Sequence, residues 1–356
     1  MYQATELELN KLLSQAVERN ASDLHLKVGE PPVIRVDSQL IRLDNYQVLS
    51  DQLLHDLIDF MLNDTQKELF RAQRDVDISY SFKDSIRFRV NVYQQKGVVG
   101  IALRAIPNQI KTLEELNLPP ILRTLADRKQ GLVLFTGPTG HGKSTAMASL
   151  VNEINHSRAE HILTIEDPIE FVFTPATSIV TQREVNVDTP SFAQALRSAL
   201  REDINVLLVG EMRDLESVAS ALTLAETGHL IFATLHTNDA AQSVDRIVDV
   251  FPPGQQNQIR AQLANVLTGI VSIRLLPQIG GGRIPAYEIL IANHAIRNVI
   301  RDNKSYEINN IIHTSLDSGM VPMDKILALL VKQGLVELET AQAHVKDKEY
   351  FLSLLG

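Results

Sequence analysis

The sequence predicts an α/β fold, in which a small α+β domain precedes a larger domain with a parallel sheet and a helical tail. Three observations predict it. Polar and apolar residues alternate in the first third of the chain, which is typical of half-buried strands. Short apolar runs then alternate with helical stretches, as in a parallel sheet with crossover helices. One of these runs leads directly into a glycine-rich loop at residues 137–145.

Residues 1–106 are predicted to form the small α+β domain. Apolar residues from Leu9 to Val17 recur at helical spacing and predict an opening helix. An extended stretch begins near Leu24. Alternation then predicts three strands, at residues 75–82, 86–92 and 98–106.

Residues 107–120, which contain three prolines, are predicted to be a linker. The larger domain is expected over 121–292 and the helical tail over 293–356. Four apolar runs predict its parallel strands, at Leu132–Phe135, Ile162–Ile165, Val206–Val209 and Leu230–Leu235.

Two helix starts in this domain can be read from capping residues. Thr189 followed by Pro190 predicts a helix that runs through Arg201. Asp214 predicts the cap of another helix, which Gly228 closes.

Composition is that of an ordinary soluble protein, with 44% hydrophobic and 22% charged residues. No apolar run has the length of a membrane span, and the first six residues lack the features of a signal peptide. We therefore expect a cytoplasmic protein without direct membrane insertion. The absence of cysteine excludes disulfides, thiolate metal sites and a cysteine nucleophile, and the net charge of -9 disfavours broad nucleic-acid binding.

The glycine-rich loop matches the phosphate-binding pattern G-x-x-x-x-G-K-[ST] at every fixed position. A buried strand precedes it and a helix follows it, which argues against an ordinary glycine turn. Lys143 is expected to meet the β- and γ-phosphates, and Ser144 to ligate Mg²⁺. The loop therefore predicts binding of ATP with Mg²⁺, by Gly137, Pro138, Thr139, Gly140, His141, Gly142, Lys143, Ser144 and Thr145.

Two carboxylates follow predicted strands at the edge where parallel sheets place their ligands. Glu166 comes after one apolar run and Glu211 after another. We assign Glu211 to Mg²⁺, directly or through water, and Glu166 to polarising the attacking water. The reverse assignment, and a solvated acid at a strand end, stay open.

His229 and His236 bracket the last parallel strand of the predicted sheet. Each is either a structural histidine or a sensor of the γ-phosphate through hydrogen bonds. A histidine metal site is disfavoured because no dense set of ligands stands nearby in the sequence.

Arginines on two neighbouring predicted strands share one face of the small domain. Arg87 and Arg89 lie two residues apart, and Arg104 lies on the next strand. They form either a solvated basic face or a group that supplies charge to a nucleotide of a neighbouring subunit. Further candidates for such a role are Arg197, Arg201 and Arg213.

Together these motifs resemble the type IV pilus retraction ATPases, within the secretion ATPase superfamily. The resemblance spans nearly the whole chain. It rests on stretches similar to the family's Walker A, aspartate box, Walker B and histidine box, at residues 137–145, 164–171, 209–214 and 226–237. Residues 21–26, 87–91 and 295–301 also match.

The resemblance implies a homohexamer with an N-terminal PAS-like domain and a C-terminal RecA-like ATPase domain. It implies that His229, His236, Arg87, Arg89 and Arg104 act at a nucleotide between subunits. It also implies pilus retraction and twitching motility, at the cytoplasmic side of the inner membrane. The implied partners are an inner-membrane platform protein and a paralogous retraction ATPase, with no nucleic acid.

The chain departs from the family pattern at His141, where serine is usual, and we expect a small effect on turnover. An accessory pilus or secretion ATPase of the same superfamily is the first alternative function. A nucleic-acid motor and a phosphotransferase are the others, and both are disfavoured. The negative net charge argues against a nucleic-acid motor, and the lack of a recognisable acceptor pocket argues against a phosphotransferase.

Overall fold

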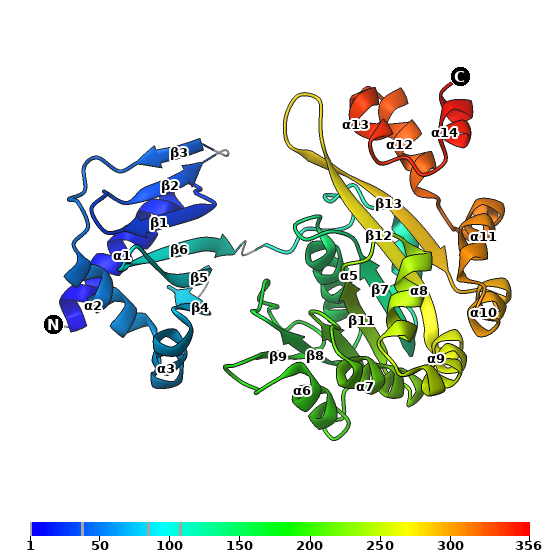
Figure 1. The fold of residues 1–356 in the computed structure, drawn as a ribbon, viewed down its shortest axis with the longest axis horizontal. Helices are drawn as coiled ribbons and strands as arrows, with labels where there is room; N and C mark the ends of the chain where they lie inside the picture. The colour runs from blue at the N-terminus through cyan, green and yellow to red at the C-terminus, as the bar shows by residue number, and fades with distance from the viewer. Residues whose placement is uncertain (1, 37–38, 84–85, 107–108) are drawn as a thin grey trace. The chain divides into compact units, whose positions relative to one another are not determined.

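The computed structural model describes residues 2–36, 39–83, 86–106 and 109–356, and it divides into two compact units (Figure 1). The first comprises Met1–Gln109 and Pro168–Val172, and the second comprises Ile110–Asp167 and Phe173–Gly356. Each unit has a hydrophobic core of its own. The expected linker begins with Pro107 and Asn108, which lie outside the described residues, and residues 109–119 contain no helix or strand.

The first unit is an antiparallel sheet of six strands in the order β3-β2-β1-β6-β5-β4. The strands are β1 (Asp23–Lys27), β2 (Val33–Val36), β3 (Gln39–Arg42), β4 (Asp75–Phe82), β5 (Ile86–Gln95) and β6 (Val98–Ile106). The helices are α1 (Tyr2–Glu18), α2 (Asp51–Met61) and α3 (Asp64–Gln73).

The sequence pattern predicted α1 and the strands β4, β5 and β6 of this unit. Leu9, Leu12 and Leu13 are fully buried, which confirms the apolar face of α1. The short strands β2 and β3 went unpredicted, because four residues carry too little alternation to be recognised.

The second unit is built on a sheet of seven strands in the order β13-β12-β7-β11-β10-β8-β9. All neighbouring pairs are parallel except β12 and β13. The strands are β7 (Gly131–Thr136), β8 (His161–Glu166), β9 (Ile179–Glu184), β10 (Val206–Val209), β11 (Leu230–Leu235), β12 (Leu267–Pro277) and β13 (Arg283–Ile291). The four predicted apolar runs are β7, β8, β10 and β11, so the α/β fold class is confirmed.

Helices flank this sheet (Figure 1). They are α4 (Arg123–Ala126), α5 (Lys143–Ser157), α6 (Phe192–Ala199), α7 (Leu215–Glu226), α8 (Ala240–Asp249) and α9 (Pro253–Val266), with a 3₁₀ turn η1 (Pro120–Leu122). Asp214 caps α7 as predicted, since its side chain accepts the N–H of Ser217.

The predicted start of α6 is wrong. Ser191, and not Thr189, is the N-cap of α6, and its hydroxyl accepts the N–H of Gln194. Thr189 instead pairs with Val185 in an isolated β-bridge, because its backbone N–H donates to the carbonyl of Glu184. Thr189, which the sequence pattern predicted as the helix cap, is therefore part of the tight turn after β9.

The C-terminal helices continue from β13. They are α10 (His294–Arg301), α11 (Ile308–Thr314), α12 (Met323–Lys332), α13 (Leu338–Gln342) and α14 (Lys348–Leu355), with 3₁₀ turns η2 (Ser305–Glu307) and η3 (Leu316–Ser318). Residues of α12 and α14 share a small apolar core with Leu276 of β12 and Ile284 of β13. Within the described ranges, no helix is both long and apolar enough to cross a bilayer.

Arg297 of α10 anchors this C-terminal part to the sheet domain. Its guanidinium donates to the carbonyl oxygens of Ala264 (2.5 Å), Asn265 (2.6 Å) and Leu267 (3.1 Å). These carbonyls stand at and just beyond the end of α9, where a helix leaves its acceptors without partners. Arg297 lies in the stretch 295–301 that the resemblance singled out, and its role here is to cap α9.

We expect Arg297→Met to lower the free energy of unfolding by about 1.5–3 kcal/mol, because several carbonyls lose a charged donor. Urea unfolding measures the change. Arg301→Met is the matched control, since Arg301 donates to the side chains of Asn298 and Asn265 on the surface. An equal loss of stability in both variants would contradict the capping role.

Candidate functional site

The glycine-rich loop joins the end of β7 to the start of α5, as the pattern required. Gly137 has φ +139°, and a Cβ there would lie 2.3 Å from the carbonyl oxygen of Ile273 in β12. Only glycine fits so close to another backbone. The N-terminus of α5 follows at once, and its free N–H groups are a ready site for phosphate.

Lys143 begins α5 and is almost fully buried, with 6% of its surface exposed. Its ammonium donates to the carbonyl oxygens of Gly137 (2.8 Å) and Pro138 (3.0 Å). The charge is thereby held within the loop whose amides would surround a phosphate.

His236 connects the loop to Glu211. Its Nε2 lies 3.2 Å from Oε2 of Glu211. Its Nδ1 lies 3.2 Å from the Thr139 hydroxyl and 3.5 Å from Nζ of Lys143. When Nδ1 accepts from the loop, Nε2 carries the proton and donates to the carboxylate. One imidazole thus bridges the phosphate loop and a strand-end acid.

Glu211 is also held by Arg213, through contacts of 2.6 Å to each carboxylate oxygen. Burial disfavours the charged form of Glu211, but the hydrogen bond and charge of Arg213, with the hydrogen bond from His236, outweigh it and lower the pKa of Glu211. The carboxylate is therefore ionised at neutral pH. Arg213, one of the further arginine candidates, is in this structure a partner of Glu211.

Glu166 ends β8, next to the end of β10. It is buried, with 7% of its surface exposed. Its Oε1 accepts hydrogen bonds from the hydroxyl of Thr164 (2.8 Å) and from Nε2 of Gln182 in β9 (3.3 Å). These donors fix the direction of the carboxylate. Glu166 and Glu211 thus lie at the same edge of the sheet in different surroundings.

His229 and His236 lie at opposite ends of strand β11. Strand β11 separates the two histidines, and its first residue pairs with Gly131 whereas its last pairs with Thr136 beside the loop. Nδ1 of His229 lies 2.9 Å from the carbonyl oxygen of Leu224, near the end of α7. The structure therefore does not bring His229 to the phosphate loop of its own chain.

The three arginines of the first unit share one face of its sheet. Arg89 and Arg104 are cross-strand partners, and Arg87 lies two residues along β5. Arg104 donates to Asp23 at 2.8 Å with 72% of its side chain exposed, and Arg89 lies 3.8 Å from Asp77. Neighbouring acids thus orient Arg89 and Arg104.

The residues at the loop fit Mg²⁺ better than a metal bound by the protein alone. In the part of the chain that the structure describes, no group of three or more His, Cys, Asp or Glu side chains could hold a metal ion. Mg²⁺ in phosphate sites takes few protein oxygens and shares the rest with phosphate and water. The hydroxyl of Ser144 and the ionised Glu211 are oxygen donors of that kind.

His141 is held against β12. Its Nδ1 accepts the N–H of Leu275 at 3.0 Å, in the part of β12 that extends beyond the end of β7. Burial, followed by the charges of Arg274 and Lys143, keeps the pKa of His141 below its ordinary value. A neutral imidazole is what this acceptor role requires. Arg283 of β13 adds a hydrogen bond to the Gly140 carbonyl (3.3 Å). Both strands of the β12–β13 hairpin therefore contact the loop.

Sequence reasoning did not identify Thr164, Gln182 or the Leu275 N–H. Thr164 stands two residues before Glu166, where a strand places side chains on one face, so its role could have been inferred. Gln182 and Leu275 are 16 and 134 residues away from their partners, and only the register of the strands brings them there.

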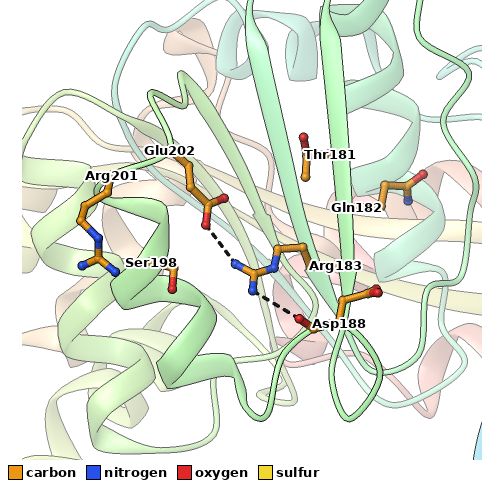
Figure 2. A pocket seen from close by; sticks show the side chains of 7 residues that line it. All are labelled: Thr181, Gln182, Arg183, Asp188, Ser198, Arg201 and Glu202. Atoms are coloured by element: carbon orange, nitrogen blue, oxygen red, sulfur yellow. Dashed lines mark hydrogen bonds and ion pairs between the residues drawn. The ribbon is translucent and has the colours of Figure 1, made fainter.

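A separate pocket lies between β9 and the end of α6 (Figure 2). Arg183 donates there to Glu202 at 2.9 Å and to the Asp188 carbonyl at 3.3 Å. Because an acid already compensates this guanidinium, it is not poised for phosphate. None of the lining residues belongs to the glycine-rich loop: Thr181, Gln182, Arg183, Asp188, Ser198, Arg201 and Glu202.

Comparison with known proteins agrees with the resemblance seen in the sequence. The family model described as "Type II/IV secretion system protein" matches residues 3–282. The type IV pilus retractation ATPase PilT of Pseudomonas aeruginosa is 45% identical over 97% of this chain and 100% of its own length. The type IV pilus ATPase PilU of the same organism is 38% identical, over 95% of this chain and 88% of its own.

A solved structure is similar over nearly the whole chain. The crystal structure of the pilus retraction motor PilT with bound ADP has a TM-score of 0.89 and 46% identity. It covers 96% of this chain and 98% of that one. Nucleotide binding and ATPase activity follow for this chain.

We expect His141→Ser to retain most turnover, because the loop amides and Lys143 stay in place. The free energy of unfolding of the variant should depend less on pH than that of the wild type. An unfolded chain takes up a proton at His141 near its ordinary pKa of 6.5, whereas the folded chain resists it. Stability from this residue is therefore present above that pH and is lost as the pH falls towards the folded pKa.

Urea unfolding at about pH 7.5 and about pH 5.5 measures this linkage. The wild type should lose more stability than His141→Ser between the two conditions. An ATPase rate near zero for His141→Ser, or a larger acid loss in that variant, would contradict the account.

Proposed function

The chain belongs to the type II/IV secretion system protein family, in its branch of pilus retraction ATPases, and we propose that it is the ATP-driven motor that retracts type IV pili. The observation that carries the proposal is the His236 bridge between the phosphate loop and Glu211. It links the bound nucleotide to a strand-end carboxylate, as an enzyme that converts hydrolysis into movement requires.

The loop and the start of α5 bind ATP. Backbone N–H groups of the loop, which Pro138 lacks, surround the phosphates, and Lys143 compensates the charge of the β- and γ-phosphates. Ser144 and Glu211, directly or through water, hold Mg²⁺, which neutralises phosphate charge when bound. Catalysis is then a matter of positioning and charge stabilisation, without a covalent intermediate.

Glu166 polarises the attacking water. Its hydrogen bonds from Thr164 and Gln182 support this role, because they fix the direction of the carboxylate at the end of β8. Glu211 is ionised and is joined to the phosphate loop through His236, which supports the metal role for Glu211.

His236 senses the γ-phosphate. Its Nδ1 faces Thr139 and Lys143, so loss of the phosphate changes its hydrogen bonds, and Nε2 passes the change to Glu211. His229, at the other edge of the sheet, acts towards a nucleotide held by another subunit.

The motor is a homohexamer in which ATP lies between subunits. Arg87, Arg89 and Arg104 of one subunit reach the nucleotide of its neighbour. Their charge stabilises the transition state, as an arginine supplied from outside the site does in other ATPases. Hydrolysis then moves the first unit of one subunit relative to the second unit of the next.

The ring works at the cytoplasmic face of the inner membrane. Its partners are a platform protein of the pilus base and a paralogous retraction ATPase. The alternative function is that of an accessory motor, which the similarity to PilU supports. A nucleic-acid partner is not proposed, since the net charge is -9.

The function is tested by deleting the gene in its host and measuring twitching and surface pili. Deletion should abolish twitching and leave more extended pili, because assembled fibres are no longer withdrawn. Wild-type chain should restore both traits, and Lys143→Ala, which lacks phosphate charge compensation, should not. Normal twitching in the deletion strain would contradict a principal retraction role, and loss only when the paralogue is also absent would identify an accessory motor.

The two carboxylates are separated by Glu166→Gln and Glu211→Gln. Glu166→Gln should lower kcat by about a hundredfold or more while ATP still binds, because the attacking water loses its base. Glu211→Gln should mainly raise the Mg²⁺ concentration needed for half-maximal rate. The opposite pattern would exchange the two roles. Glu339→Gln, at an exposed position of α13, is the matched control and should keep the wild-type rate.

A further inference from the structure

Lys346, close to the C-terminus, lies between two buried carboxylates. Its Nζ is 2.9 Å from Oε2 of Glu288 in β13 and 3.2 Å from Oδ2 of Asp239, the N-cap of α8. The acid side chains are only 4% and 9% exposed. Burial disfavours the ammonium, but the charges of the two acids outweigh this and raise the pKa of Lys346.

The backbone at Lys346 is fixed by α12. The buried carboxylate of Asp324 accepts the N–H of Lys346 at 3.0 Å and the N–H of Asp347 at 2.8 Å. Asp347 in turn caps α14 by accepting the N–H of Tyr350. The segment between α13 and α14 is thus tied to the helices around it, and Lys346 extends from it towards β13 and α8.

Buried hydrogen bonds lead from Glu288 to the phosphate loop. Oε1 of Glu288 accepts from the backbone of Ala240 (3.0 Å) and from the hydroxyl of Ser272 (3.4 Å). The hydroxyl of Thr136 donates to Ser272 at 2.9 Å. Thr136 is the last residue of β7 and immediately precedes Gly137. Glu288, Ser272 and Thr136 are at most 3% exposed.

Asp239 connects Lys346 to the loop that carries His236. It accepts the N–H of Gln242 at 2.8 Å and stands three residues after His236. The loop from His236 to Asp239 is therefore held at one end by the contacts of His236 and at the other by the cap and Lys346. One ammonium thus contacts both Glu288, whose hydrogen bonds lead to Thr136, and Asp239, which follows His236.

We infer that Lys346 is a positioning residue for ATP hydrolysis, which couples the C-terminal helices to His236 and to the strand end before the phosphate loop. The two carboxylates are buried, whereas 35% of the Lys346 side chain is exposed. When this cation is removed, both buried acids lose the charge that compensates them. Either one of the two acids takes up a proton or the two carboxylates move apart. Each of these changes loosens the position of Asp239 and of the loop that carries His236. The inference rests on the proposed role of His236.

The test compares Lys346→Met with Lys346→Arg in the full-length protein. Lys346→Met should lower kcat for ATP about tenfold, a loss of transition-state positioning. Lys346→Arg should recover most of the rate, since a cavity of about 290 Å³ beside Glu288, Asp324 and Lys346 gives room for the larger head group. Lys348→Met, on the exposed start of α14, should keep the wild-type rate.

Folding and positioning are distinguished by a second variant. Lys346→Met with Glu288→Gln removes one of the two uncompensated charges, so its thermal stability should rise towards that of the wild type while kcat stays low. Recovery of both stability and rate would mean that Lys346 serves folding alone, and the inference would fail.

A double-mutant cycle with His236→Gln identifies the route. If Lys346 acts through His236, Lys346→Met should lower kcat by a much smaller factor in the His236→Gln background than in the wild type. Effects that simply multiply would overturn the inference while leaving the site proposal intact. A wild-type rate for His236→Gln alone would refute the role of His236 and the coupling together.

Discussion

The parallel register of β7, β11, β10 and β8 is the constraint on which the rest of the site depends. Thr136 pairs with Leu235, Ala233 with Val209, and Val209 with Ile165. Each strand therefore delivers its next residues to one edge of the sheet: the phosphate loop, His236, Glu211 and Glu166. Both faces of these strands are buried, so a slip by one residue would exchange the side chains packed on the two faces and would be strongly disfavoured.

The hairpin of β12 and β13 closes this edge from the side. Its backbone meets Gly137 and supplies the N–H that His141 accepts. The same hairpin carries Glu288, which Lys346 compensates. A continuous path of contacts therefore leads from residues near the C-terminus to the strand end before the phosphate loop.

The parts that could be predicted from the sequence are those with local signals. The loop, the strand-end acids and the cap Asp214 each follow from a few adjacent residues. The cap of α6 could not be read in this way, because Thr189 is taken by a bridge to Val185. The donor Gln182 and the compensation of Glu288 by Lys346 depend on pairing between distant segments. The different surroundings of His229 and His236 likewise required the order of the strands.

The central claim is that one chain supplies the phosphate loop and a neighbouring chain supplies arginine. Mixing Arg104→Ala subunits with Lys143→Ala subunits tests it most directly, with the ATPase rate measured across the mixing ratios. Each variant alone should be inactive, and mixtures should recover activity, because some interfaces then pair an intact loop with an intact Arg104. Activity that stays absent at every ratio, or an Arg104→Ala chain that is fully active by itself, would contradict the account.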